Sequence, residues 1–189
     1  LHGDDDAFDR CLTHFQRHFT AGEVERLVFL GDLIHGYGLP EDDGSLSMIL
    51  DVIALQEELG ADRVLMLLGN HEMPHIYSTT LAKGDLEFTA RFEHALGEHR
   101  AAVLAFFKRL PFYVRTAAGV LLSHAGPAPD AMPHLDTLRW LDHDAILAQA
   151  DHVLSQSEDL SAIFRQYEQV YGLPYAALAQ HYLAVEGPD

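Results

Sequence analysis

The order of apolar and polar positions along the chain changes from helix-like to strand-like and back several times. Apolar residues spaced by three and four positions predict helices over residues 4–19, 46–59 and 88–110. Two continuous apolar runs, 27–30 and 64–68, lie between these helices and are typical of strands buried on both faces. Strands that alternate with helices predict an α/β fold with a largely parallel central sheet.

The pattern changes after residue 110. Two short runs, 112–116 and 120–123, flank a turn that ends in Gly119 and predict a β-hairpin. From about residue 135 the pattern is helical, with a break near residues 172–174. A typical domain has about 100–200 residues. We therefore expect a single domain over residues 1–189, whose helical segment 143–189 forms a cap.

Three of the predicted strands are each followed by a potential metal ligand close to a glycine. The three pairs are Asp32 with Gly31, Asn70 with Gly69, and His124 with Gly126. Because α/β sheets form their sites outside the carboxyl ends of the strands, we expect these ligands to converge. A carboxylate, an amide carbonyl and an imidazole suit a divalent cation, and glycines let the backbone turn sharply beside it.

The charge balance narrows the class of function. The chain has 12 Lys+Arg against 29 Asp+Glu, a formal charge of −17, which argues against a nucleic-acid partner and a basic membrane-surface helix. The longest apolar run, 101–107, is too short to cross a bilayer, so we expect no membrane partner. The one cysteine, Cys11, excludes an internal disulfide and favours a reducing, cytoplasmic location.

Four sequence blocks follow one another in a fixed order. They are Leu1-His2-Gly3-Asp4, Gly31-Asp32, Gly69-Asn70-His71-Glu72 and Ser123-His124-Ala125-Gly126. Together they resemble the signature blocks of the calcineurin-like metallophosphoesterases. The stretch 107–130 is similar to the phosphoprotein (serine/threonine) phosphatase branch, and residues 138–142 weakly resemble the segment that follows there.

The resemblance implies an α/β/β/α sandwich and a dinuclear centre with two divalent metal ions, Mn, Fe or Zn. It implies that His2 binds the first metal and that Asp32 bridges both metals. It also implies that Asn70 and His124 bind the second metal. His71 follows a ligand directly, and the resemblance makes it the general acid that protonates the leaving oxygen.

The chain departs from the family pattern at both ends. The aspartate of the first block would precede Leu1, and no block with the last metal histidines is identifiable; His181 lies in a helical stretch without that context. We therefore expect a domain that is incomplete at both ends, with the remaining ligands outside residues 1–189.

The second block also departs from the phosphatase pattern. His35 stands where an acid would orient the catalytic histidine, and Gly36 stands where an arginine would bind phosphate. His35 is either a phosphate-facing donor or an exposed residue, and its place in a catalytic loop favours a catalytic role. Arg139 and Arg165 are candidates to replace the arginine, and His75 is interpreted as a residue behind the site or on the surface.

These features predict a metal-dependent phosphatase that hydrolyses phosphomonoesters through a metal-bridging hydroxide. The substrate is a phosphorylated small molecule or a phosphoprotein, and the loss of the arginine favours a small molecule. Two alternatives on the same fold are a nucleotide or dinucleoside polyphosphate hydrolase and a non-catalytic, metal-binding regulatory homologue. The negative charge of the chain is compatible with an anionic substrate, because two divalent cations supply local positive charge.

Overall fold

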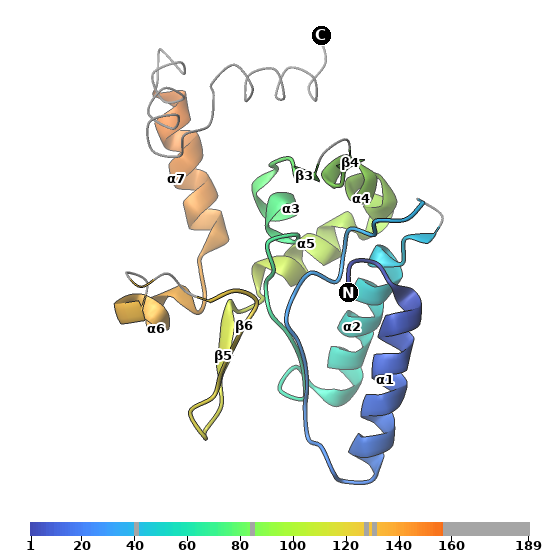
Figure 1. Ribbon diagram of the computed structural model, residues 1–189. Helices are drawn as coiled ribbons and strands as arrows, with labels where there is room; N and C mark the ends of the chain where they lie inside the picture. Colours follow the sequence, from blue (N-terminus) through green and yellow to red (C-terminus); the bar gives the residue numbers. More distant parts are fainter. Residues whose placement is uncertain (40–41, 84–85, 127–128, 130–131, 157–189) are drawn as a thin grey trace. The chain divides into compact units, whose positions relative to one another are not determined.

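The computed structural model describes residues 1–39, 42–83, 86–126, 129 and 132–156 (Figure 1). The chain divides into two compact units, Leu1–His143 and Asp144–Asp189, and each is described by itself. Most of the second unit lies outside the described residues, as do the expected helix break at 172–174 and His181. The expected cap therefore stays a prediction.

The first third of the chain forms two helices and a pair of parallel strands. Helix α1 (Asp5–Thr20) begins at Asp4, whose side chain accepts a hydrogen bond of 2.8 Å from the backbone N–H of Ala7. Helix α2 (Ser45–Leu59) lies beside α1 and ends at Gly60 (Figure 1). Strand β1 (Leu27–Phe29) pairs in parallel with β2 (Val64–Met66). This arrangement confirms the α/β class.

Both strands are shorter than the apolar runs that predicted them. The chain leaves the strand ladder at Leu30, which is 46% exposed. The backbone N–H of Leu68 donates to the carbonyl of Pro111 at 2.9 Å instead of continuing the pairing with β1. Among the described residues β1–β2 is the one parallel pair, so the parallel sheet is smaller than predicted.

The helix predicted over residues 88–110 is divided. Helix α4 (Thr89–Leu96) is followed by a single 3₁₀ turn, η2 (Gly97–His99), and then by α5 (Arg100–Lys108). Gly97 has a φ of 47°, a backbone conformation that side chains other than glycine disfavour, and this residue separates the two helices. Phe106 and Phe107 of α5 are fully buried in the core of the first unit.

The remaining elements are short. Helix α3 (Met73–Tyr77) follows β2, and strands β3 (Ala82–Lys83) and β4 (Leu86–Glu87) form a small antiparallel pair. Strands β5 (Tyr113–Arg115) and β6 (Leu121–Ser123) form the predicted hairpin. The chain continues with η3 (Met132–His134), α6 (Leu135–Leu138) and α7 (His143–Ser155). No helix in the described part is long and apolar enough to cross a membrane.

Candidate metal centre

The site begins where the two parallel strands end. Asp32 lies three residues after β1, and Asn70 and His71 follow β2. The buried carboxylate of Glu72 holds the two loops together: it accepts hydrogen bonds from the backbone N–H groups of Asp32 (3.1 Å), Leu33 (3.1 Å) and Gly69 (3.0 Å).

From the sequence, Glu72 was recognised only as the last residue of the Gly69-Asn70-His71-Glu72 block, and no role was predicted for it. Burial raises the pKa of Glu72 to about 7, although the hydrogen bonds from the backbone oppose that shift. The carboxylate can join the loops because its two oxygens accept from groups about forty residues apart in the chain. The role of Glu72 could not be predicted because it depends on the burial of the side chain, which only the structure shows.

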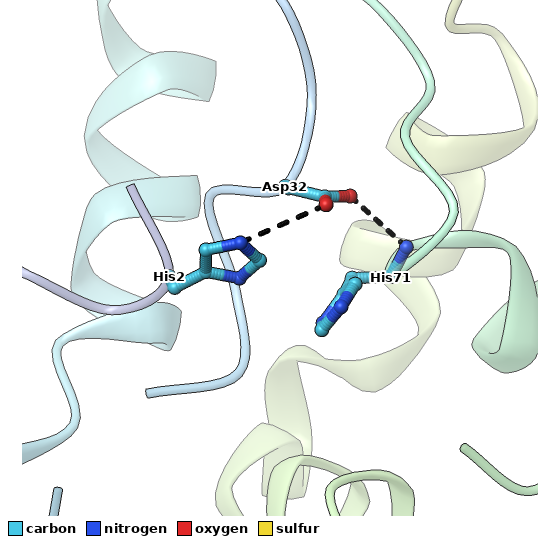
Figure 2. A group of neighbouring side chains, drawn as sticks. All are labelled: His2, Asp32 and His71. Atoms are coloured by element: carbon cyan, nitrogen blue, oxygen red, sulfur yellow. Dashed lines mark hydrogen bonds and ion pairs between the residues drawn. The ribbon is translucent and has the colours of Figure 1, made fainter. Parts of the chain in front are cut away.

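The Asp32 carboxylate lies between two sets of potential ligands. One oxygen, Oδ1, accepts a hydrogen bond of 3.1 Å from the backbone N–H of His71. The other, Oδ2, lies 3.8 Å from Nε2 of His2 and 3.3 Å from Nε2 of His124. Ligand atoms of His2, Asp32 and His71 all lie within 4.8 Å of one another (Figure 2). The structure thus brings all of the predicted ligands close to one carboxylate.

His124 and Asn70 form the second set of potential ligands. Both follow Asp32 in the sequence, whereas His2 precedes it. Nδ1 of His124 donates to the carbonyl oxygen of Leu30 at 2.7 Å, so a neutral His124 has no proton on Nε2. That Nε2 lies 2.8 Å from Oδ1 of Asn70. Three acceptor atoms, from His124, Asn70 and Asp32, therefore face one another, an arrangement that a cation among them would stabilise.

This donor set fits a divalent cation. A histidine that ligates a metal commonly donates its second N–H to a backbone carbonyl, as His124 does to Leu30. On the other side of Asp32, the buried Nδ1 of His2 has no hydrogen-bond partner among the described residues. An imidazole, an amide oxygen and a shared carboxylate are borderline-to-hard ligands of the kind that Mn, Fe and Zn accept.

Three residues of this region have positive φ angles although none of them is glycine. The angles are 53° for His2, 54° for Asp32 and 70° for His35. Each such residue costs about 1–2 kcal/mol relative to an ordinary conformation. Backbone strain of this kind concentrates at functional sites, where the surrounding structure enforces it. Here the enforcing contacts are the backbone hydrogen bonds from His2 to Asp32 (3.0 Å) and from Gly3 to Leu33 (2.7 Å).

Two of the three glycines near the ligands are needed for close approach. A Cβ atom on Gly31 would lie 2.7 Å from the backbone of Gly69, and a Cβ on Gly69 would lie 2.3 Å from Oδ1 of Asp32. Gly126 is different, because a Cβ there would meet no atom of the described residues within 4 Å. Close packing against the neighbouring loop therefore supports the expectation for Gly31 and Gly69, and for Gly126 it stays a prediction.

His35 is buried, so the interpretation that it is simply exposed is wrong. Its Nδ1 lies 2.9 Å from Nδ1 of His71, and its Nε2 lies 2.8 Å from Nε2 of His75. Both ring nitrogens are thus within hydrogen-bond distance of other imidazoles. Burial, together with the neighbouring histidines, lowers the pKa of His35 from 6.5 to about 3.

His75 is also buried, so its placement on the surface is wrong, and its position behind the site is what the structure shows. Its Nδ1 lies 2.7 Å from Oε1 of Glu93, and Arg100 donates to the other oxygen of Glu93 at 2.7 Å. Burial lowers the pKa of His75, although Glu93 opposes that shift. No sequence pattern linked Glu93 to the site, since it lies 18 residues from His75 on another helix.

The arginines have other partners. Arg91 donates to the carbonyl oxygens of Gly38 (3.0 Å) and Leu39 (2.8 Å) and forms an ion pair of 3.0 Å with Asp43, so it stabilises the loop after β1. The guanidinium of Arg139 packs over the ring of Trp140, 5.6 Å from its centroid. Arg165 lies outside the described residues.

A pocket with a volume of about 350 Å³ adjoins the second set of ligands. Asn70, Tyr113, Ser123 and His124 are the lining residues with polar side-chain atoms. The remainder of its lining is largely apolar and includes Leu68, Met73, Phe112, Leu121, Leu135 and Leu141. A molecule held at the ligands through a charged group can therefore extend an apolar part into this pocket.

The fold and the site define a metallohydrolase-like α/β domain, in which loops after parallel strands carry a shared carboxylate and imidazole ligands. The chain belongs to the calcineurin-like phosphoesterases, because the model of that family matches residues 1–181. Searches of curated proteins and of solved structures gave no match. Members of this family are generally hydrolases that cleave phosphoesters and typically use divalent metals.

Proposed function

We propose that this protein is a phosphomonoesterase that binds two divalent ions, one on each side of Asp32. The observation that carries the proposal is the position of Oδ2 of Asp32 between the imidazoles of His2 and His124. His2 and Asp32 would hold the first ion, and Asp32, Asn70 and His124 would hold the second. Bound there, the ions would lower the pKa of a water molecule and neutralise charge on the phosphoryl oxygens.

His71 is the proposed general acid. Its backbone N–H donates to Asp32, which fixes the residue beside the ligands, and its side-chain Nδ1 lies against His35. As the ester P–O bond breaks, the leaving oxygen takes a proton from Nε2 of His71, and the neutral ring regains a proton from solvent. General acid catalysis of this kind contributes about 10²–10⁴-fold in rate.

The surroundings of the site favour a small phosphorylated molecule over a phosphoprotein. Gly36 has no cationic side chain at the position where the phosphatase branch has an arginine. Arg91 cannot replace that arginine freely, because it already binds loop carbonyl groups and Asp43. The pocket beside His124 and Asn70 suits a leaving group with an apolar part. In this proposal, the similarity of residues 107–130 to the phosphoprotein phosphatase branch reflects common ancestry and does not define the substrate.

The test is hydrolysis of p-nitrophenyl phosphate by the metal-depleted protein before and after addition of Mn²⁺, Fe²⁺ or Zn²⁺. We expect activity only with added metal. We also expect about two equivalents of bound metal per protein, measured by inductively coupled plasma mass spectrometry. Bis-p-nitrophenyl phosphate and a phosphopeptide measure the preference for monoesters and small molecules. The Asp32→Asn variant is expected to lose both activity and bound metal. A protein with both ions bound and no hydrolysis of any of these substrates would instead favour a regulatory, non-catalytic role.

A further inference from the structure

We propose that Glu93 fixes the tautomer of His71 through two intervening histidines and is a positioning residue for the proposed general acid. The inference rests on the proposed function of His71. It concerns a chain of four side chains that starts at the metal centre and ends at an ion pair with Arg100.

The chain consists of three imidazoles and one carboxylate, joined by three contacts. Nδ1 of His71 lies 2.9 Å from Nδ1 of His35, and Nε2 of His35 lies 2.8 Å from Nε2 of His75. Nδ1 of His75 lies 2.7 Å from Oε1 of Glu93. Each of these distances is that of a hydrogen bond, so in each pair one atom carries the proton and the other accepts it.

The carboxylate decides the direction of every bond in the chain. Glu93 is an acceptor, so His75 carries its proton on Nδ1 and leaves Nε2 unprotonated. His35 must then donate from Nε2, which leaves its Nδ1 unprotonated. His71 must in turn donate from Nδ1, and its neutral form has no proton on Nε2. The expected tautomers are thus Nδ1–H for His75, Nε2–H for His35 and Nδ1–H for His71.

This direction requires that the middle ring be neutral, and its surroundings favour that state. The side chain of His35 is 1% exposed, stacks on Phe88 with a centroid distance of 5.3 Å and lies edge-on to Phe92. Within the described residues its ring nitrogens hydrogen-bond to two imidazoles and to no carboxylate. Burying an unpaired charge in such a place is costly.

At the far end, the ionised state of Glu93 is supported by two donors. His75 donates to one oxygen and Arg100 donates to the other at 2.7 Å. These hydrogen bonds lower the pKa of Glu93 although partial burial alone would raise it. Glu93 therefore stays an acceptor at neutral pH, and the direction of the chain is fixed.

The direction matters for the proton that His71 is proposed to deliver. A protonated imidazole has N–H groups on both nitrogens, so His71 can take up a proton on Nε2 only if an acceptor faces its Nδ1–H. The unprotonated Nδ1 of His35 is that acceptor. If the chain ran the other way, His35 would present an N–H to His71, and two N–H groups would oppose each other in the protonated state.

The direct test is the tautomeric state of each histidine in the metal-free protein, read from ¹⁵N–¹H correlation spectra of the imidazole rings. We expect the wild-type protein to show Nδ1–H for His71 and His75 and Nε2–H for His35. A spectrum with Nε2–H on neutral His71 overturns the inference without any measurement of activity.

The matched perturbation is Glu93→Gln, with Glu98→Gln as its control. A glutamine amide can either accept from or donate to His75, so it no longer imposes one direction on the chain. Glu98 is an exposed residue of the neighbouring turn η2, and its substitution makes the same chemical change away from the chain. We expect Glu93→Gln to shift His71 toward Nε2–H and to lower kcat on the order of tenfold, with KM and bound metal within about twofold of wild type.

The outcomes are separable from those of the proposed function. Unchanged tautomers in Glu93→Gln, with a kcat like that of Glu98→Gln, overturn the inference. If Glu93→Gln fails to fold, the wild-type spectrum alone decides. A wild-type chain with the expected tautomers and no phosphatase activity supports the tautomer assignment and refutes the proposed function.

Discussion

Gly69→Ala is the most direct probe of how tightly the ligand loops are packed. The added Cβ would lie 2.3 Å from Oδ1 of Asp32 and 2.6 Å from both the backbone nitrogen of Asp32 and Oε2 of Glu72. Ordinary contacts of a Cβ begin near 3.4 Å, so the Asp32 carboxylate would have to move by about 1 Å. The backbone nitrogen cannot move without straining Asp32, which already has a positive φ.

The expected effect on stability follows from this overlap. Overpacking in a rigid, buried setting costs about 1–3 kcal/mol in the free energy of unfolding. Metal binding should also weaken, because the atom that moves belongs to the shared ligand. We expect metal affinity to fall at least tenfold, the scale seen when groups that orient ligands are lost.

The assay combines urea unfolding of the metal-free protein with titration of Mn²⁺ or Zn²⁺ by calorimetry. Gly126→Ala is the matched control, since Gly126 is also a glycine near a predicted ligand and its Cβ would meet no atom of the described residues within 4 Å. We expect that control to unfold within about 0.5 kcal/mol of wild type and to bind metal normally. Equal behaviour of the two variants would refute the packing argument.

Three further predictions concern the proposed acid, the metal and the buried histidine. His71→Asn should keep bound metal and lower kcat about 10²–10⁴-fold for phenyl phosphate, a poor leaving group, and less for p-nitrophenyl phosphate; equal losses on the two substrates would contradict the acid role. Removal of metal with a chelator should lower the free energy of unfolding, by about 2.7 kcal/mol if free metal had been at one hundred times its Kd, which thermal unfolding with and without chelator checks. The pKa of His35 falls from 6.5 to about 3 on burial, so the unfolded chain binds more protons in that range and stability falls as the pH drops from 6.5 toward 3. His35→Gln should flatten this slope in urea unfolding of the metal-free protein, and an unchanged slope would show that other groups cause it.

Several parts of the site were predictable because they lie at the ends of apolar runs. Asp32 and Asn70 follow the paired parallel strands β1 and β2, so their convergence follows from sequence order and sheet geometry. His124 follows β6, which belongs to a separate antiparallel pair, so sheet geometry alone does not account for its position. The hairpin of β5 and β6 was predictable for a similar reason, since a turn with glycine separates two short apolar runs.

Other parts were not predictable, because they depend on packing between distant segments. The link from His75 to Glu93 joins α3 to α4, and no periodicity relates the two positions. Gly69 and Gly126 both lie within two residues of a predicted ligand, yet among the described residues only a Cβ on Gly69 would lie against other atoms. The division between α4 and α5 depends on one glycine with a positive φ, which the helical periodicity does not register.

The sequence separations within the ligand set have a consequence for folding kinetics. His124 contacts Asn70 and Leu30, which lie 54 and 94 residues away, and Glu72 joins loops 40 residues apart. Contacts of this range form only after long loops have closed, and closing them is slow. Metal binding should therefore leave the refolding rate almost unchanged and slow unfolding, so that a bound ion lengthens the lifetime of the folded chain rather than hastening its formation.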